Sequence, residues 1–172
     1  MKILGGTSRA SVLTLRKALT DAVSKQSASD AASFASDLFT ILTVLSSSVG
    51  LRRALTDNAR DKSAKAELIS NLFGKNIKAD AQALLATAAS LRWSSPAELA
   101  DAVEQLAVEA QSAAAEKSNE QESLESELFD FARVLIANPD LRQGLNTSAD
   151  SDEGKLALLD AVVKGKYVSS TH

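Results

Sequence analysis

Apolar residues recur at every third or fourth position along most of the chain, and this spacing predicts a succession of amphipathic helices. The first helix is expected over about 8–24, where Val12, Leu15, Leu19 and Val23 fall on one stripe. Further helices are expected over about 30–46, 51–55, 61–73, 79–93, 96–118 and 124–135. No stretch shows the strict alternation of a half-buried strand, so the pattern predicts an all-α fold.

Breaker and cap residues mark several of the expected helix ends. Gly74 directly follows an apolar helical pattern and is expected to stop that helix. Ser94-Ser95-Pro96 provides a serine cap followed by a proline at the first helical position. Asn138-Pro139 breaks the last strong helical pattern. These signals place a new helix directly after residue 95.

An internal repeat indicates the architecture. A shift of 90 residues brings Ser36-Asp37-Leu38-Phe39 onto Ser126-Glu127-Leu128-Phe129, Leu51-Arg52 onto Leu141-Arg142, and Lys65 onto Lys155. Core and polar positions match together, so shared amphipathicity alone is an inadequate explanation and a duplicated helical unit is indicated.

The repeat and the helix pattern together predict two parts. Residues 1–95 are expected to form a bundle of about six helices, closed by the start of a long helix over 96–118. Residues 96–172 are expected to hold that helix and an incomplete second unit, because the counterpart of residues 83–93 would start at about residue 173. An incomplete bundle exposes an apolar stripe that further chain or a partner must cover.

Composition argues against catalysis. The 172 residues include no Cys, which removes disulfides, thiolate metal sites and a cysteine nucleophile. The single His is the terminal His172, expected to be a frayed tail residue, and the carboxylates do not cluster on an apolar face. Gly5-Gly6 lacks the flanks of a phosphate loop and is interpreted as a flexible N-terminus. We therefore expect a non-enzymatic protein without metal or cofactor.

Membrane and nucleic-acid classes are less favoured. No apolar run approaches the length of a membrane span, so any link to a membrane is expected to go through partners. Residues 1–95 carry 13 Lys/Arg and 7 Asp/Glu, whereas residues 96–172 carry 6 and 15. Because the basic residues are scattered without aromatic interleaving, solvated surfaces are the better interpretation, and a nucleic-acid binder ranks third.

Arg92-Trp93 allows two interpretations. Large aromatic residues usually serve packing, so a half-buried Trp93 that staples two helices is favoured. The alternative is an interface anchor, since Trp and Arg are enriched at binding hot spots. A helical bundle without a catalytic set generally acts by offering a groove to another helix.

An ordered set of short motifs carries a resemblance to a known family. They are Ser8-Arg9, Leu51-Arg52-Arg53-Ala54-Leu55-Thr56-Asp57, Lys65-Ala66-Glu67-Leu68, Leu72-Phe73-Gly74, Arg92-Trp93-Ser94 and residues 127–135 (ELFDFARVL). In this order they resemble the delta subunit of F-type ATP synthase, called OSCP in mitochondria, in its longer bacterial form. The Tyr-Ala common near the start of shorter members is replaced by Arg9-Ala10-Ser11.

The resemblance implies a structural role and a binding groove. Family members act as stator components that tie the catalytic head to the peripheral stalk, at the cytoplasmic face of the cell membrane, without cofactors. The N-terminal helix of an alpha subunit lies between their first and fifth helices. On this sequence those helices carry Val12, Leu15, Leu19, Leu84, Ala88 and Leu91.

Two expectations accompany this assignment. The family's C-terminal α/β region, which meets the b subunit of the stalk, is missing from these residues, so we expect a fragment. The alternative function is a helical protein-interaction adaptor that is unrelated to ATP synthase and shares only the bundle architecture.

Overall fold

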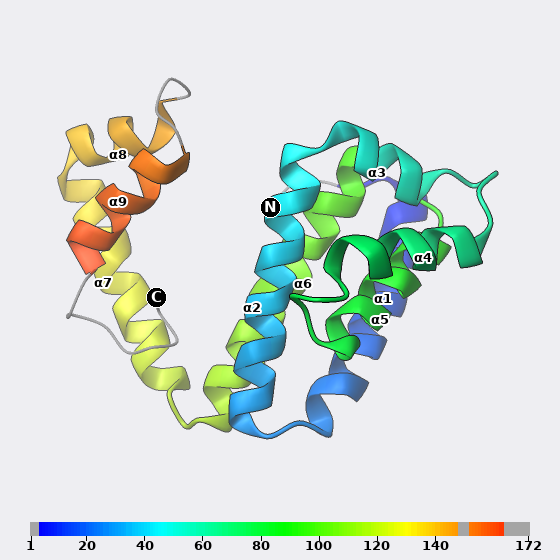
Figure 1. Cartoon of the computed structure of the whole chain (residues 1–172). Coiled ribbons are helices and arrows are strands. Elements are labelled where there is room, and N and C mark those ends of the chain that lie inside the picture. Colours follow the sequence, from blue (N-terminus) through cyan, green and yellow to red (C-terminus); the bar gives the residue numbers. More distant parts are fainter. Residues whose placement is uncertain (1–3, 148–151, 164–172) are drawn as a thin grey trace. The chain divides into compact units, whose positions relative to one another are not determined.

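A computed structural model describes residues 4–147 and 152–163, and its regular structure there is entirely helical (Figure 1). The helices are α1 (Gly6–Ser24), α2 (Ala28–Ser47), α3 (Val49–Thr56), α4 (Lys62–Phe73), α5 (Ala79–Ser90), α6 (Pro96–Lys117), α7 (Gln121–Ala137), α8 (Pro139–Asn146) and α9 (Asp152–Val163). The predicted all-α class is confirmed. The chain forms two compact units, Met1–Ala114 and Ala115–His172, each described separately below; the expected tail residue His172 lies outside the described residues.

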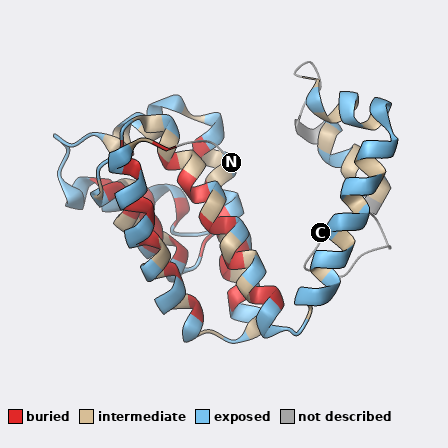
Figure 2. Ribbon diagram, turned by 180° about the vertical axis from the view of Figure 1, so that it is seen from behind, coloured by how far each residue is buried: buried red, intermediate tan, exposed pale blue. Residues whose placement is uncertain are grey.

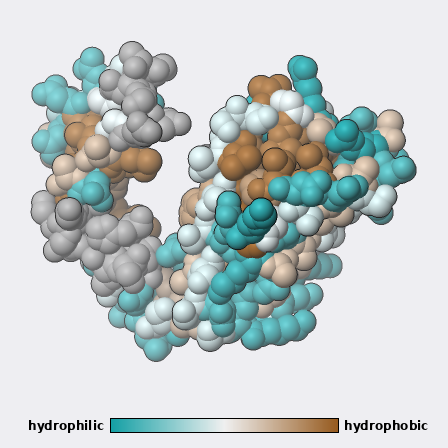
Figure 3. Space-filling view, in the orientation of Figure 1, coloured by the Kyte–Doolittle hydropathy of each residue, from teal (hydrophilic) through white to brown (hydrophobic). Residues whose placement is uncertain are grey.

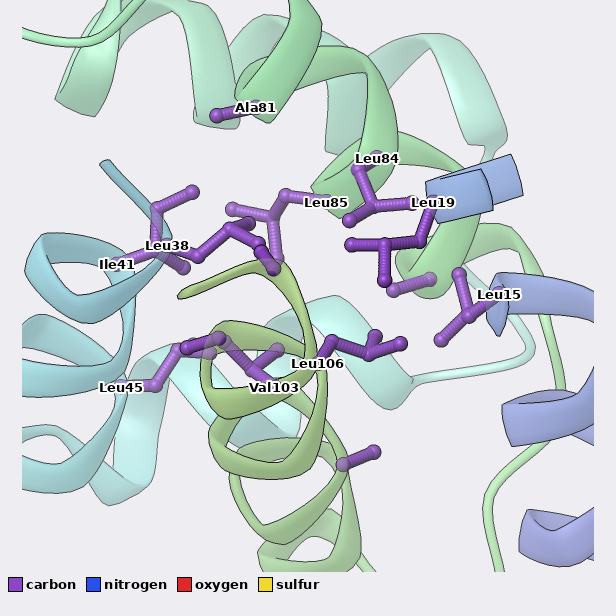
Figure 4. Packing of buried hydrophobic residues seen from close by; sticks show 14 of the residues in the cluster. Leu15, Leu19, Leu38, Ile41, Leu45, Ala81, Leu84, Leu85, Val103 and Leu106 are labelled. Carbon is purple, nitrogen blue, oxygen red and sulfur yellow. The ribbon is translucent and has the colours of Figure 1, made fainter. Parts of the chain in front are cut away.

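The first unit is built around α5. This helix contacts α1, α2, α3 and α4, and its buried alanines, such as Ala88, let neighbouring helices come close. In the core, Leu38 and Ile41 of α2 face leucines of α5 and α6 (Figure 4). A cavity of about 10 Å³ remains between these three helices. Since one water needs about that volume, α2, α5 and α6 pack closely against one another here.

Local contacts with the backbone fix the end of α2, the start of α3 and the end of α4. Ser48 ends α2 and caps α3, accepting a hydrogen bond from the Leu51 N–H at 3.1 Å. The Arg52 guanidinium donates to the Leu45 carbonyl and, at 2.9 Å, to the Ser46 carbonyl at the end of α2. Gly74 ends α4, and a Cβ there would collide with the Ser70 carbonyl. Two of the family motifs therefore contain residues that shape the fold.

Helix α6 belongs mainly to the first unit, so the boundary falls after Ala114 and not after residue 95 as the sequence suggested. Its apolar side, which includes Leu99, Val103 and Leu106, is buried in the first core. The α6 positions that correspond to Leu15 and Leu19 of α1 are Gln105 and Glu109. Both are polar and half-buried, so at these two positions α6 does not repeat the core leucines of α1, although Val12 and its counterpart Ala102 are both buried.

The long helix is unbroken, as the sequence predicted, and runs from Pro96 to Lys117. Asn119 follows it with φ of 59°, the left-handed conformation that commonly ends a helix. The Glu120 N–H donates to the Ala115 carbonyl at 2.8 Å, which satisfies one of the last carbonyls of α6.

The second unit contains α7, α8 and α9, and its packing is much lighter. No described residue of these three helices is buried (Figure 2). When the chain is shifted by 90 residues, α3 falls on α8 and α4 falls on α9, each with both ends matching. The end of α2 falls on the end of α7. Contacts join α7 to α8 and α8 to α9, the latter at Gly144, where an added Cβ would lie 3.1 Å from Leu158.

Helix α2 corrects one expectation from the sequence. By length and composition alone, α2, with 20 residues, is the described helix that is long and apolar enough to cross a membrane. That apolar content is what a core helix needs, since Phe34, Leu38, Ile41 and Leu45 are all buried in the first unit. The exposed side carries Thr40 and Thr43, so we interpret α2 as a bundle helix.

The contrast between two leucines of α1 gives a stability test. Leu15 is fully buried and Leu13 is 61% exposed, although both lie on one helix. Leu15→Asp places an unpaired charge in the core and is expected to lower the free energy of unfolding by about 4 kcal/mol or more. Leu13→Asp is expected to change it by no more than about 0.5 kcal/mol. Urea unfolding followed by circular dichroism measures both, and equal losses would contradict the burial of α1 described here.

Candidate functional site

The structure places the six predicted groove residues inside the first unit. Five of them, Val12, Leu15, Leu19, Leu84 and Ala88, are buried members of the core, and Leu91 is half-buried against it. Leu19 and Leu84 point toward each other between α1 and α5 (Figure 4). These residues pack α1 against α5 and form the floor of any binding surface along the two helices. A partner that binds there must therefore contact the neighbouring, more exposed residues.

Small side chains border the line where α1 meets α5. The two helices are held at one end by the Gln26 amide, which donates to Asp80 at 2.9 Å. Helical spacing puts Thr14 and Ala18 on α1, and Ala83 and Thr87 on α5, beside the leucines that join the two helices. Thr14 and Ala83 are exposed and the other two are half-buried. Short side chains on both helices leave a shallow surface that another helix could approach closely.

The other end of α1 is fastened to the connection between α5 and α6. The Ser8 hydroxyl accepts a hydrogen bond from the Ser94 N–H at 2.9 Å, and the Ser11 hydroxyl donates to the Arg92 carbonyl at 2.6 Å. Gly5 caps α1 and lies so close to Ser94 that a Cβ there would collide with its side chain. The Ser-Arg and Arg-Trp-Ser motifs thus meet in space, and the interpretation of Gly5 as part of a flexible terminus is wrong.

Trp93 is a packing residue in this structure. It is buried in the core, and its indole Nε1–H donates to the Ala88 carbonyl at 2.9 Å. This position supports the packing interpretation over the interface anchor. The side chain of Arg92 is exposed, so an interface role stays a prediction for Arg92 alone.

An ion pair joins α1 to α6 on the opposite side of α1. The Arg16 guanidinium binds the Glu109 carboxylate with two nitrogens, at 2.8 Å from Nε and 2.6 Å from Nη2. This hydrogen bonding raises the pKa of Arg16. Leu13 and Val108, one residue from each helix close to this pair, are exposed apolar side chains. The α1–α6 side therefore offers a second surface against which the α1–α5 surface can be tested.

Lys65 is the one buried charged residue among those described for the first core. It is 5% exposed, and its ammonium donates to the Ala89 carbonyl at 2.7 Å. Ala89 lies in the last turn of α5, where carbonyls lack helical partners and a positive charge is favourable. Burial lowers the pKa of Lys65 from its ordinary value of 10.5. Sequence reasoning noticed this lysine only as a repeated motif residue and missed its role in capping α5.

Hydrophobic side chains also gather on the surface over the end of α2 and the start of α3 (Figure 3). Val49 is exposed at the start of α3, and Val44 is half-buried near the end of α2. We assign no partner to this patch.

The arrangement supports binding more readily than chemistry. Within residues 4–147 and 152–163, no three His, Cys, Asp or Glu side chains gather where they could hold a metal ion. With the boundary after Ala114, the first unit has 13 Lys/Arg and 11 Asp/Glu, a net charge of +2, and the second has 6 and 11, a net charge of −5. The strongly basic half suggested by the sequence disappears because the acidic residues of α6 belong to the first unit. Fold and surface define an all-helical bundle with an open surface between two helices.

Known proteins identify the family. The chain is 38% identical over 166 residues to ATP synthase subunit delta of Kineococcus radiotolerans, across 96% of this chain and 60% of that protein. It is 35% identical over 171 residues to the same subunit of Streptomyces coelicolor, across 99% and 62%. It is 39% identical over 137 residues to that of Beutenbergia cavernae, across 80% and 51%. No protein-family model matches the chain.

These similarities cover nearly all of this chain. Over the stretch that it shares with them, the chain belongs to the ATP synthase subunit delta family, and the resemblance found in the motifs is confirmed. The chain spans about three fifths of the length of the first two relatives.

The depressed pKa of Lys65 predicts how stability changes with pH. Between the folded-state pKa and 10.5 the unfolded chain binds more protons than the folded chain, so the contribution of this site to stability rises with pH through that interval. We expect the free energy of unfolding of the parent, minus that of Lys65→Met, to increase from neutral pH to about pH 10.5. Lys75→Met, at an exposed lysine, serves as the control for removing a surface charge. A difference that falls with pH would contradict the burial of Lys65.

Proposed function

We propose that the chain is a stator component of a rotary F-type ATP synthase, linking the catalytic head to the peripheral stalk. Every relative described above is an ATP synthase subunit delta, which supports this assignment. In this role the protein acts without chemistry of its own. It lies peripherally at the cytoplasmic face of the cell membrane, through the enzyme to which it binds, and serves proton-driven ATP synthesis.

The partner that we propose for the first unit is the N-terminal helix of an alpha subunit. It would lie along the border between α1 and α5, over the floor formed by Leu15, Leu19 and Leu84. The observation that carries this proposal is the row of small side chains on both sides of that floor, which allows a helix to pack closely. Contact with the b subunit of the stalk stays a prediction, and it concerns the part of the delta subunits that lies outside the stretch shared with this chain.

The alternative functions are less well supported. An adaptor unrelated to ATP synthase would not account for the identity to delta subunits across 96% and 99% of the chain. Nucleic-acid binding loses its main argument, because the first unit has a net charge of only +2.

A larger side chain at the border of α1 and α5 tests whether the alpha-subunit helix binds there. Ala83 is exposed, so Ala83→Arg is expected to leave the fold intact while its side chain fills the space of a docked helix. We expect this variant to bind a peptide of the alpha-subunit N-terminus at least tenfold more weakly than the parent, a loss of about 1.4 kcal/mol. Calorimetric titration of the full chain measures the affinity, and circular dichroism confirms the fold.

Leu13→Arg is the matched control, because Leu13 is exposed and helical spacing turns it away from Leu15 and Leu19, which pack toward α5. It is expected to bind the peptide as tightly as the parent. Weakened binding by Leu13→Arg with normal binding by Ala83→Arg would move the site to the α1–α6 side. A parent chain that does not bind the peptide would refute the proposed partner.

A further inference from the structure

Among its described residues, the second unit has no counterpart of α5, the helix at the centre of the first bundle. In the first unit α5 packs against α2, α3 and α4. In the second unit α7, α8 and α9 repeat those three helices at a distance of 90 residues, and the shift would place a counterpart of α5 from residue 169 onward. The described residues stop at 163, so α7–α9 form the surroundings of such a helix without showing the helix itself.

Burial at matching positions indicates where that helix would lie. Leu38 is 2% exposed, whereas its counterpart Leu128 is 52% exposed. In the first unit Leu38 lines the small core cavity together with Leu84 and Leu85 of α5. Leu128 is therefore exposed at the position that α5 covers in the first unit. Hydrophobic side chains accordingly reach the surface of the second unit (Figure 3).

The other large core side chains of α2, α3 and α4 also have apolar counterparts, whereas the small buried residues Ala31 and Ala35 correspond to the polar Gln121 and Glu125. The apolar counterparts in the second unit are half-buried, not buried: Leu124 for Phe34, Phe131 for Ile41, Leu135 for Leu45, Leu145 for Leu55 and Leu159 for Ile69. Apolar residues retained at core positions favour a covered face over a solvated one.

A lysine gives the proposed helix a direction. Lys65 of α4 donates to the Ala89 carbonyl in the last turn of α5. Its counterpart on α9 is Lys155, which is half-buried and to which no hydrogen bond or ion pair is seen within the described ranges. An ammonium in this place would meet the C-terminal carbonyls of a helix that runs as α5 does. This second observation is independent of the apolar positions.

Helix α6 cannot supply the missing element. Its apolar side is buried in the first core, and residues such as Gln105 and Glu109 occupy the face on which α1 carries leucines. In the first unit, moreover, it is α5 and not α1 that contacts α2, α3 and α4 together. The second unit therefore requires a helix that packs against α7, α8 and α9 in the way that α5 packs against α2, α3 and α4.

We propose that the second unit is a receptor for one amphipathic helix, packed against α7–α9 as α5 packs against α2–α4, with its C-terminal turn at Lys155. Its buried face carries Ala and Leu at the spacing of Ala81, Leu84, Leu85 and Ala88. Its outer face favours basic residues, because the second unit has a net charge of −5. This inference does not depend on binding of the alpha subunit.

The source that we assign to this helix is delta-family polypeptide outside the shared stretch. The relatives contain such polypeptide, since this chain spans 60% and 62% of two of them. Residues 74–78 are enough to connect α4 to α5. A connection of the same length after α9 would deliver the helix in chain order, without a second molecule.

The test uses α5 itself as the probe. A copy of residues 79–93 is attached directly after residue 168 of the full chain, in place of residues 169–172. Thermal unfolding by calorimetry is expected to show the transition of the second unit shifted upward by about 10 °C or more. In the matched control the copy carries Leu84→Gln and Leu85→Gln, which keep the helix length but remove the apolar face, and no shift is expected.

Lys155→Met provides an internal check on direction. In the extended chain it is expected to lower the shifted transition by several degrees, and in the parent chain to leave unfolding unchanged. An extended chain whose second unit melts like the parent, or like the Gln control, would overturn the proposal. So would sedimentation of the parent chain as a dimer that Leu128→Gln dissociates, because a second copy would then cover this face.

Discussion

The structure of the first unit depends on how α5 is enclosed. Four helices pack against its twelve residues, and its alanines set how closely they approach. Enclosure buries the C-terminal carbonyls of α5, which have no helical partners and would be costly if left unpaired. Trp93 donates to the Ala88 carbonyl and Lys65 to the Ala89 carbonyl. The buried tryptophan and the buried lysine thus answer one requirement, the termination of a helix inside a core.

The same requirement explains why the family motifs surround the core and not the binding surface. Arg52 binds the carbonyls at the end of α2, Gly74 permits the tight end of α4, and Ser8 holds α1 to the connection after α5. The surface proposed for the alpha-subunit helix consists instead of Thr14, Ala18, Ala83 and Thr87. A shallow docking surface needs small side chains more than particular ones, so it leaves little trace as a motif.

Helical periodicity made the fold class and most helix bounds predictable, because burying one face imposes a 3.6-residue period. It could not separate groove from core: Leu15 and Leu84 follow the pattern that both roles would require, and only packing shows them to be core. The domain boundary was displaced for a related reason. Pro96 marks a true helix start, but the apolar side of α6 faces the unit before it. The contacts of Ser8 with Ser94 and of Lys65 with Ala89 join distant positions that no local pattern connects.

The central claim is that α5 makes the first unit self-sufficient, whereas α7–α9 lack such a helix among the described residues. Native-state amide exchange on the 172-residue chain tests it most directly, because protection reports the free energy of local opening. The account predicts the slowest exchange in α5 and the helices packed on it, with α7–α9 exchanging at least about 100-fold faster, equivalent to about 2.8 kcal/mol. Equal protection of α5 and α7–α9 would contradict it.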